Sequence, residues 1–159
     1  MKLELIVVGK IKEAYWNDAI AEYSKRLSKY CKLMITQVAD EKTPDTASDA
    51  MEEAIRKKEG ERILRCIKED AYVITLEIEG QSLDSVAFAK KLEQLAVQGK
   101  SHICFIIGGS LGLSREVKQR ADYALSFSAM TFPHQLMRVV LLEQIYRAYR
   151  IQSGEPYHK

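Results

Sequence analysis

The sequence has 159 residues, which is enough for one domain with a substantial core and too few for two ordinary domains. Hydrophobic residues at 47% and charged residues at 29% are typical of a globular protein, so we expect disorder only in the last few residues. The net charge of +2 favours no class of partner as a total, but an acidic segment at 39–70 lies between two basic ends, a weak pointer to a polyanionic partner.

The chain carries no sign of membrane insertion, secretion or a metal centre. Glu4 interrupts the apolar run that follows Lys2, and no apolar stretch approaches the length of a membrane span. The three cysteines lack C-x-x-C spacing and are odd in number, which is typical of reduced, packed thiols in a cytoplasmic protein. The three histidines are equally scattered, so we expect no metal site.

Strand-like and helix-like patterns alternate along the chain. The expected strands are 3–8, 33–38, 72–78, 103–107 and 124–127. The expected helices are 13–30, 50–67, 83–98, a short one at 114–121, and a last one from 135 to 150. This alternation predicts a single α/β domain, residues 1–159, with a mainly parallel sheet flanked by helices.

Single residues mark the ends of some elements. Gly80 is expected to end the third strand, Ser82 to cap the helix after it, and Gly99 to terminate that helix. Gly60 lies inside the second helix and weakens it by about 1 kcal/mol relative to alanine.

The last helix is apolar around roughly half its circumference, which is more than one core contact needs. Two interpretations stay open: a helix buried deeply in its own domain, or one whose extra width packs against a second subunit. Arg138 lies within the apolar arc and favours the second subunit, because a buried guanidinium needs a carboxylate, a row of carbonyls or an anionic ligand.

Three loops follow the carboxyl ends of strands, where parallel sheets bind ligands. They are Glu77–Gly80, Gly108–Gly112 and Ser126–Pro133. The second lets a ligand approach the main chain and can adopt positive φ, but it matches neither a dinucleotide nor a phosphate-loop motif. A tight turn between strand and helix explains it equally well.

Four motifs in order resemble one family. They are ITLEIEG, FIIGGSLG, LSFSAMTFPHQLMRVVLLEQIYRAYRI and a terminal PYHK. Together with the opening MKLELIVVGK they resemble the RlmH family of ribosomal RNA methyltransferases, which belongs to the SPOUT class of knotted methyltransferases. The likeness runs the full length of the chain.

The resemblance implies a homodimer with a C-terminal trefoil knot that binds S-adenosylmethionine among the knotted loops. The activity it implies is methylation of N3 of a pseudouridine in a stem-loop of 23S rRNA, with the assembled ribosome as substrate. Carried over by motif, the cofactor-binding residues are Leu76, Gly108, Phe127, Ser128, Ala129, Met130, Thr131 and Phe132.

Methyl transfer from a sulfonium needs no metal, but the protein must help N3 lose its proton. Three arginines are candidates for stabilising the developing anion, namely Arg138, Arg147 and Arg150, and of these we select Arg147. Tyr157 and His158 can exchange a proton or stack on a base, and the tail that holds them can reach the cofactor loop of a partner subunit. A plain ion pair of Arg147 with Glu143, and a disordered tail, are the structural alternatives.

Two rival functions remain open from the sequence. One is a nucleotide- or flavin-binding α/β enzyme, which a glycine-rich loop on a parallel sheet allows. The other is a catalytically silent, dimeric RNA-binding module.

Overall fold

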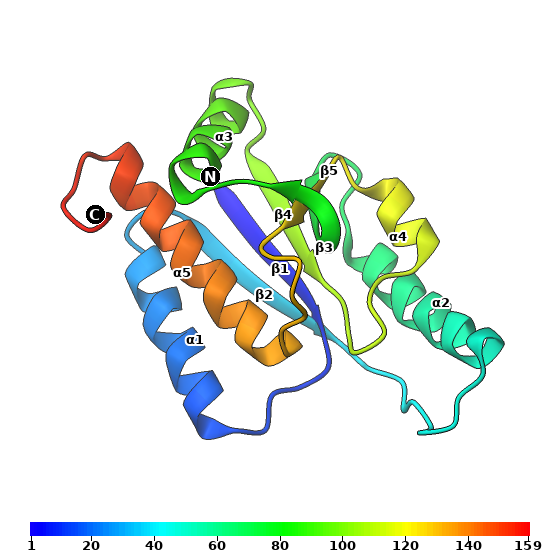
Figure 1. The fold of residues 1–159 in the computed structure, drawn as a ribbon. Coiled ribbons are helices and arrows are strands. Elements are labelled where there is room, and N and C mark those ends of the chain that lie inside the picture. The colour runs from blue at the N-terminus through cyan, green and yellow to red at the C-terminus, as the bar shows by residue number, and fades with distance from the viewer.

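The computed structural model describes residues 1–159 and confirms the predicted alternation of strands and helices. The strands are β1 (Lys2–Val8), β2 (Lys32–Val38), β3 (Tyr72–Ser82), β4 (His102–Ile107) and β5 (Tyr123–Ser126). The helices are α1 (Ala14–Leu27), α2 (Asp49–Cys66), α3 (Ser85–Val97), α4 (Arg115–Arg120) and α5 (His134–Gln152). All four strand pairings are parallel, and the order across the sheet is β2-β1-β4-β3-β5 (Figure 1).

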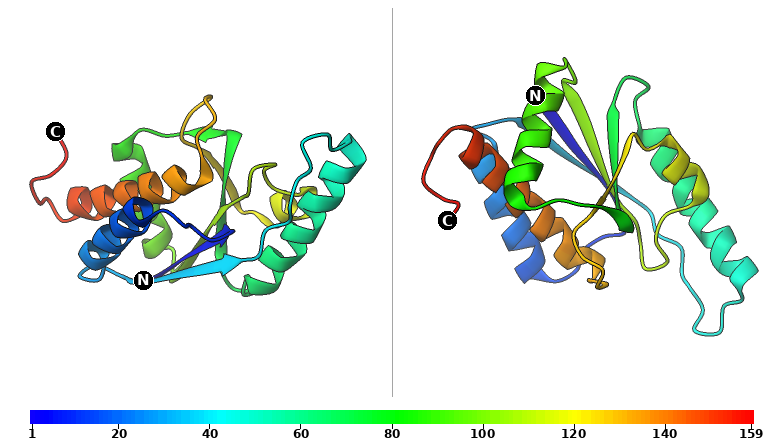
Figure 2. Two further views of the ribbon diagram at one scale, coloured as in Figure 1. Left: turned by 90° about the horizontal axis from the view of Figure 1, so that it is seen from below. Right: turned by 45° about the horizontal axis from the view of Figure 1, so that its top comes forward.

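The sheet separates two hydrophobic cores. Along β1, the side chains of Leu3, Leu5 and Val7 face the larger core, which α1, α3 and α5 cover. Ile6 and Val8 point the other way, into a smaller core under α2 and α4. Because both faces of β1 and β4 are covered, these strands are apolar almost throughout, as a strand buried on both sides requires. Figure 2 shows the two helical layers from below.

Three helices begin at a side-chain cap. Ser48 accepts the N–H of Met51 at the start of α2, and Ser114 accepts that of Val117 at the start of α4. The cap of α3 is Asp84, whose carboxylate accepts the N–H of Ala87 at 2.7 Å. The prediction that Ser82 caps this helix is therefore wrong, because β3 continues through that residue.

Two glycines allow segments of the chain to approach closely. β3 does not end at Gly80 as predicted, and a Cβ at this position would lie 2.8 Å from the backbone of Ala124 in β5. Gly60 lets α2 contact the N-terminus of α4, because a Cβ there would lie 2.2 Å from Oγ of Ser114. The glycine that weakens α2 as an isolated helix thus permits its packing against α4.

Gly99 follows α3 with φ of +83°, and its predicted role as a helix terminator is confirmed.

Candidate functional site

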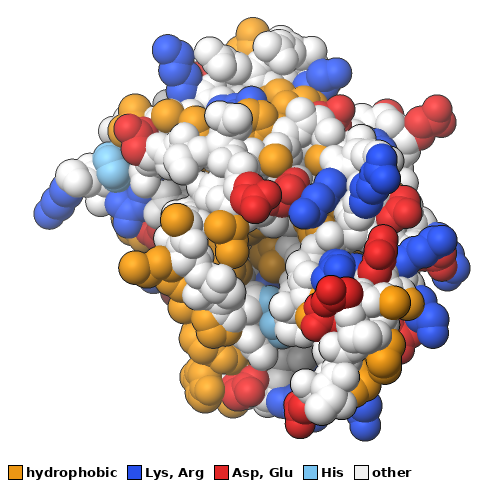
Figure 3. Space-filling model, turned by 45° about the vertical axis from the view of Figure 1, so that its right-hand side comes forward, with side chains coloured by type: hydrophobic (Ala, Val, Ile, Leu, Met, Phe, Trp, Pro, Cys, Tyr) orange, Lys and Arg blue, Asp and Glu red, His pale blue; other side chains and the backbone are white.

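A cavity of about 820 Å³ lies at the carboxyl ends of β3, β4 and β5. Its walls are the three loops selected from the sequence together with the first turn of α5. They comprise Leu76–Ile78, Ile107–Leu113, Leu125, Phe127, Ser128 and Met130–Gln135, with Met137. Figure 3 shows the hollow on this face of the molecule, between hydrophobic side chains on one side and charged side chains on the other. Its volume is in the range of small-molecule and cofactor sites.

The structure brings together seven of the eight residues predicted to bind a cofactor. Leu76 contributes from β3, Gly108 follows β4, and the others lie in the loop between β5 and α5. Ala129 is the exception, since it does not line the cavity. The sheet topology explains this convergence, because β4, β3 and β5 are neighbours and end at the same edge.

The glycine-rich loop folds tightly on itself. Gly109 and Gly112 form an isolated bridge, and the N–H of Gly112 donates to the carbonyl of Gly109 at 3.1 Å. Gly112 has φ of +82°, so this position needs the left-handed freedom of glycine. Gly108 does not adopt positive φ; a Cβ there would meet the backbone of Gly112 at 2.9 Å. The loop is thus both a tight turn and a wall of the cavity, so the two interpretations of its sequence are compatible.

Glu77 supplies the one acidic side chain of the cavity wall, and no lysine or arginine lines it. The hydroxyl of Thr75 donates to its carboxylate at 2.6 Å, and Lys118 lies 3.9 Å away. In the sequence alone, Glu77 is only the first residue of a selected loop. Its place directly after the apolar part of the third strand is the signal that identifies it, because side chains at that edge of a parallel sheet face such a cavity.

The next strand, β5, holds this part of β3 in place. Register between the two strands shifts after Leu76, so the segment that contains Glu77 and Ile78 leaves the regular pairing. The hydroxyl of Ser126 donates to the carbonyl of Ile78 at 2.8 Å and also contacts the carbonyl of Ser128 at 3.2 Å. One buried serine therefore links the β3 wall of the cavity to the loop before α5.

Arg138 lies in the core of its own chain, which corrects the prediction that it indicates a second subunit. Its side chain is 2% exposed, and one terminal nitrogen donates to the carbonyls of Val8 and Gly9 at 2.8 and 2.9 Å. The end of β1 thus supplies a carbonyl row to one terminal nitrogen, whereas Nε and the other terminal nitrogen are buried without a hydrogen-bond partner. Burial lowers the pKa of Arg138.

Next to it, His134 lines the cavity. Its Nδ1 lies 3.4 Å from the same guanidinium nitrogen, and burial and then the charge of Arg138 lower its pKa. His134 is the first residue of α5, so this contact joins the start of the helix to Arg138 one turn later.

The three residues predicted to be catalytic form a second cluster, on the outer side of α5. The guanidinium of Arg147 donates to the carboxylate of Glu143 at 2.6 and 3.0 Å, so the expected ion pair is present. Tyr157 donates to the same oxygen at 3.1 Å, and Nδ1 of His158 lies 3.1 Å from Arg147. The hydrogen bond to Glu143 raises the pKa of Arg147, and burial raises that of Tyr157.

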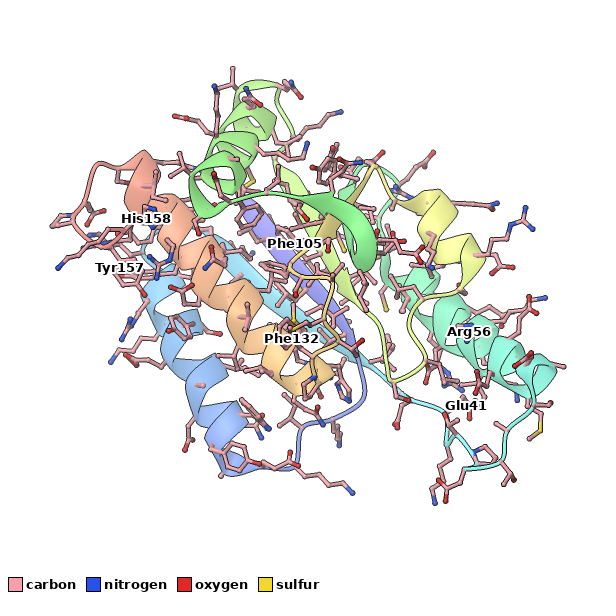
Figure 4. All side chains as sticks on the ribbon, in the orientation of Figure 1. Glu41, Arg56, Phe105, Phe132, Tyr157 and His158 are labelled. Carbon is pink, nitrogen blue, oxygen red and sulfur yellow. The ribbon has the colours of Figure 1, made fainter.

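This cluster and the cavity are separate within one chain. His134 lines the cavity, and Arg147 follows it thirteen residues later along the same helix. At 1.5 Å per residue these positions are about 20 Å apart. Figure 4 shows Phe132 beside the beginning of α5, and Tyr157 and His158 beside its other half. A substrate atom held at the cavity therefore does not reach the second cluster of the same chain.

The tail after α5 is held against the protein. Glu155 accepts the hydroxyl of Tyr30 at 2.7 Å and forms ion pairs with Arg150 and Lys29. Tyr157 packs edge-on against Tyr146, with ring centroids 5.0 Å apart. The expectation of a disordered tail is thus wrong for this structure, because these contacts fix residues 154–158 to α1 and α5.

Two kinds of arrangement are absent from the structure. No group of three or more histidine, cysteine, aspartate or glutamate side chains is arranged to hold a metal ion. None of the helices combines the length and the apolar character that crossing a membrane requires.

Comparisons with known proteins agree with this architecture. The family described as predicted SPOUT methyltransferases matches residues 1–158. The chain is 65% identical to the ribosomal RNA large subunit methyltransferase H of Bifidobacterium adolescentis and 60% identical to that of Clostridioides difficile, over the full length of both chains in each pair. In structure it resembles a probable methylase family protein from Haemophilus influenzae Rd KW20, with a TM-score of 0.54 and 13% identity over 99% of this chain and 70% of the other. These findings confirm the resemblance seen in the sequence motifs: the chain belongs to the ribosomal RNA large subunit methyltransferase H family of SPOUT methyltransferases.

Proposed function

We propose that this protein transfers a methyl group from S-adenosylmethionine to N3 of a pseudouridine in 23S rRNA, at a site of the pseudouridine 1915 type, within the assembled ribosome. The observation that carries the proposal is the pair of separate clusters. A cofactor-sized cavity with a main-chain wall lies at one end of α5, and a cationic, proton-exchanging cluster lies beside its other half. Family membership supplies the reaction class, and the similarity to ribosomal RNA large subunit methyltransferases H supports the rRNA substrate.

The residues that line the cavity suit the proposed cofactor, S-adenosylmethionine. Leu76, Phe127 and Phe132 offer apolar surface to an adenine ring, and the glycine loop offers main-chain groups at close range. The first turn of α5 has no side-chain cap and suits a carboxylate, because its N–H groups carry partial positive charge. Glu77 suits hydroxyl or ammonium groups. S-adenosylmethionine, when bound, supplies an electrophilic methyl group on a sulfonium.

The residues of the second cluster suit the nucleotide half of the reaction. N3 of a pseudouridine must lose a proton before or during methylation, and a nearby guanidinium stabilises the resulting anion. Arg147 is held in a fixed orientation by its two hydrogen bonds to Glu143. Tyr157 and His158 place a hydroxyl and an imidazole next to it. A neutral imidazole can accept the proton, and the Tyr157 hydroxyl, which donates to Glu143, can take up a proton only as it passes its own to that carboxylate.

A homodimer resolves the separation of the two clusters. We propose that the Arg147 cluster of one subunit completes the cavity of the other, so that each active site uses two chains. An apolar stripe on the outer face of α5 supports an interface there. Leu136, Val139 and Val140 are only half-buried and lie outside both hydrophobic cores, although they are next to the cavity in sequence and space.

We also propose that the C-terminal part of the chain forms the trefoil knot that membership of the SPOUT class implies. Family membership supports this, and so does the strand order, in which β5 pairs with β3 while α5 packs on the core beside α1 and α3. A knot holds the loops around the cavity in a fixed arrangement.

Transfer of a labelled methyl group tests the proposal. Purified protein, ribosomes and labelled S-adenosylmethionine are incubated, and the product nucleotide is mapped in 23S rRNA. The proposal predicts one methylated pseudouridine per ribosome, with no transfer to ribosomes that are already modified. Label on another nucleotide, or binding of ribosomes without transfer at saturating cofactor, would contradict it.

A further inference from the structure

Positive charge is concentrated on one end of the molecule. Segments 22–32 and 143–159 meet there, where the second half of α1, the start of β2, the second half of α5 and the tail come together (Figure 1). We call this region the α1–tail surface. It carries seven lysines and arginines and three glutamates, whereas the rest of the chain carries seventeen bases and nineteen acids. A chain that is nearly neutral as a whole thus has one strongly basic end, which favours a polyanionic partner.

The same surface holds most of the tyrosines. Five of the eight in the sequence lie there: Tyr23, Tyr30, Tyr146, Tyr149 and Tyr157. Tyr30 stacks on Tyr149 with ring centroids 5.4 Å apart, and Tyr146 meets Tyr157 edge-on at 5.0 Å. The rings form one continuous cluster across α1, α5 and the tail. All five rings are half-buried, and Tyr23, Tyr146 and Tyr149 pack against the larger core, so the cluster offers part of its ring surface for stacking with unpaired bases.

Cations interleave with these rings. The guanidinium of Arg26 lies 5.3 Å from the centroid of Tyr23 and 5.6 Å from that of Tyr146. Lys29 lies 5.3 Å from the centroid of Tyr30, and Arg147 lies 4.8 Å from that of Tyr157. Arg26 and Lys29 remain accessible, with 41% and 69% of their side chains exposed. Alternating aromatic and cationic groups is the surface chemistry that contacts bases and phosphates of single-stranded nucleic acid together.

The surface is ordered before any partner binds. Glu155 joins the tail to α1 through Tyr30 and Lys29 and to α5 through Arg150. Arg150 also donates to Tyr30 at 3.2 Å and to the carbonyl of Pro156 at 3.1 Å. A partner therefore meets a preformed face and does not have to order the tail, which lowers the entropic cost of binding.

We propose that the α1–tail surface is a docking surface for an unpaired RNA segment next to the methylated nucleotide, with α1 extending the contact beyond the catalytic cluster. The proposal rests on the proposed function, since it assigns a binding surface to the rRNA substrate. Lys25 and Lys32 are the residues predicted to contact the RNA, because both are exposed at the edge of the surface and form no ion pair in the chain. They are free to contact phosphates, whereas Arg147 and Arg150 are already paired with glutamates.

The test uses the double variant Lys25→Glu with Lys32→Glu. The matched control is Lys57→Glu with Lys58→Glu, two exposed and unpaired lysines on α2, across the sheet from α1. Affinity for purified ribosomes and for protein-free 23S rRNA is measured over a range of salt concentrations, together with methyl-transfer kinetics. Cofactor affinity by calorimetry and oligomeric state by sedimentation check that neither variant alters the cavity or the assembly.

The α1 variant should bind both RNA substrates at least tenfold more weakly, with KM raised and kcat at saturating ribosome nearly unchanged. The slope of log affinity against log salt should fall by about 1.4, as expected for two lost contacts to single-stranded phosphates at about 0.7 each. The α2 variant should behave like the wild type. Equal losses in both variants, or affinity within twofold of the wild type for the α1 variant, would overturn the proposal.

Two further outcomes separate this proposal from the proposed function. If the α1 variant binds 23S rRNA normally and ribosomes poorly, the partner of the surface is a ribosomal protein and the assignment to RNA is wrong. If the wild type binds 23S rRNA through this surface but transfers no methyl group, the docking surface stands and the proposed function fails. If the wild type transfers the methyl group normally and the α1 variant binds RNA like the wild type, the proposed function stands and the docking surface fails.

Discussion

The substitution Gly108→Ala tests whether the glycine loop is a wall of the cofactor site. A Cβ at this position would lie 2.9 Å from the carbonyl carbon of Gly112 and 3.0 Å from its oxygen, which are backbone atoms that cannot rotate away. The loop must therefore shift, and Gly108, Gly112 and their neighbours are all part of the cavity wall. Overpacking of this kind costs about 1 to 3 kcal/mol.

Two measurable effects follow from this shift. The melting temperature should fall by about 2 to 4 °C for each kcal/mol in a chain of this size. The affinity for S-adenosylmethionine, measured by titration calorimetry, should fall at least about tenfold, or 1.4 kcal/mol. The affinity falls because the new methyl group displaces the loop itself, and not because it occupies space that the ligand needs.

Gly99→Ala is the matched control. Gly99 has φ of +83° and no atom near its missing side chain, so alanine there costs about 1 to 2 kcal/mol through backbone strain alone. It lies after α3, outside the cavity wall. The control should lose stability and keep cofactor affinity. Unchanged affinity in folded Gly108→Ala, or an equal loss of affinity in Gly99→Ala, would refute the assignment of this loop.

Three further predictions concern the dimer, the tail and a buried acid. Leu136→Glu with Val140→Glu should convert a dimer into folded monomers in sedimentation experiments, and a persistent dimer would place the interface elsewhere. Removal of 157–159 should leave cofactor affinity nearly intact while methyl transfer falls at least about a hundredfold, and near-normal transfer would assign the tail a structural role only. Burial raises the pKa of Glu59, so its contribution to stability is present below the unfolded pKa of about 4.3 and is lost as pH rises through the folded pKa. In urea unfolding, Glu59→Gln should therefore exceed the wild type in stability near neutral pH and lose that advantage as pH falls; a constant difference would be evidence against this.

Much of the fold could be predicted because local patterns and tertiary packing agree. The uninterrupted apolar run of β4 predicts a strand covered on both faces, and the structure buries all six of its residues. The same agreement placed three loops at one edge of the sheet, where the cavity lies. The position of each loop directly after a strand was enough to predict this, since parallel strands place their carboxyl ends at the same edge of a sheet.

The sequence reasoning failed where a residue is explained by a distant part of the chain. Gly60 and Gly80 are needed because α4 and β5 approach them, and neither neighbour is visible in the local pattern. Arg138 looked like an interface residue because its partners, the carbonyls at the end of β1, are 129 and 130 positions away. The wide apolar arc of α5 is only partly explained within one chain, because α1 and α3 pack against it while Val139 stays half-buried outside both cores. A charged residue at Leu142, in the same arc, would disrupt the core and not an interface, since this residue is fully buried.

Mixing two impaired variants, assayed at a cofactor concentration well below the Kd of the Gly108→Ala variant, tests most directly whether the active site is built from two chains. One variant lacks 157–159 and keeps an intact cavity, and the other carries Gly108→Ala and keeps an intact tail. After exchange of subunits, half of the dimers are mixed, and each mixed dimer has one site with an intact cavity and a partner's intact tail. We predict recovery of about a quarter of wild-type methyl transfer to ribosomes, as two-fold symmetry requires. Failure of the mixture to exceed the two separate variants, with subunit exchange verified by differently tagged chains, would contradict a site shared between subunits.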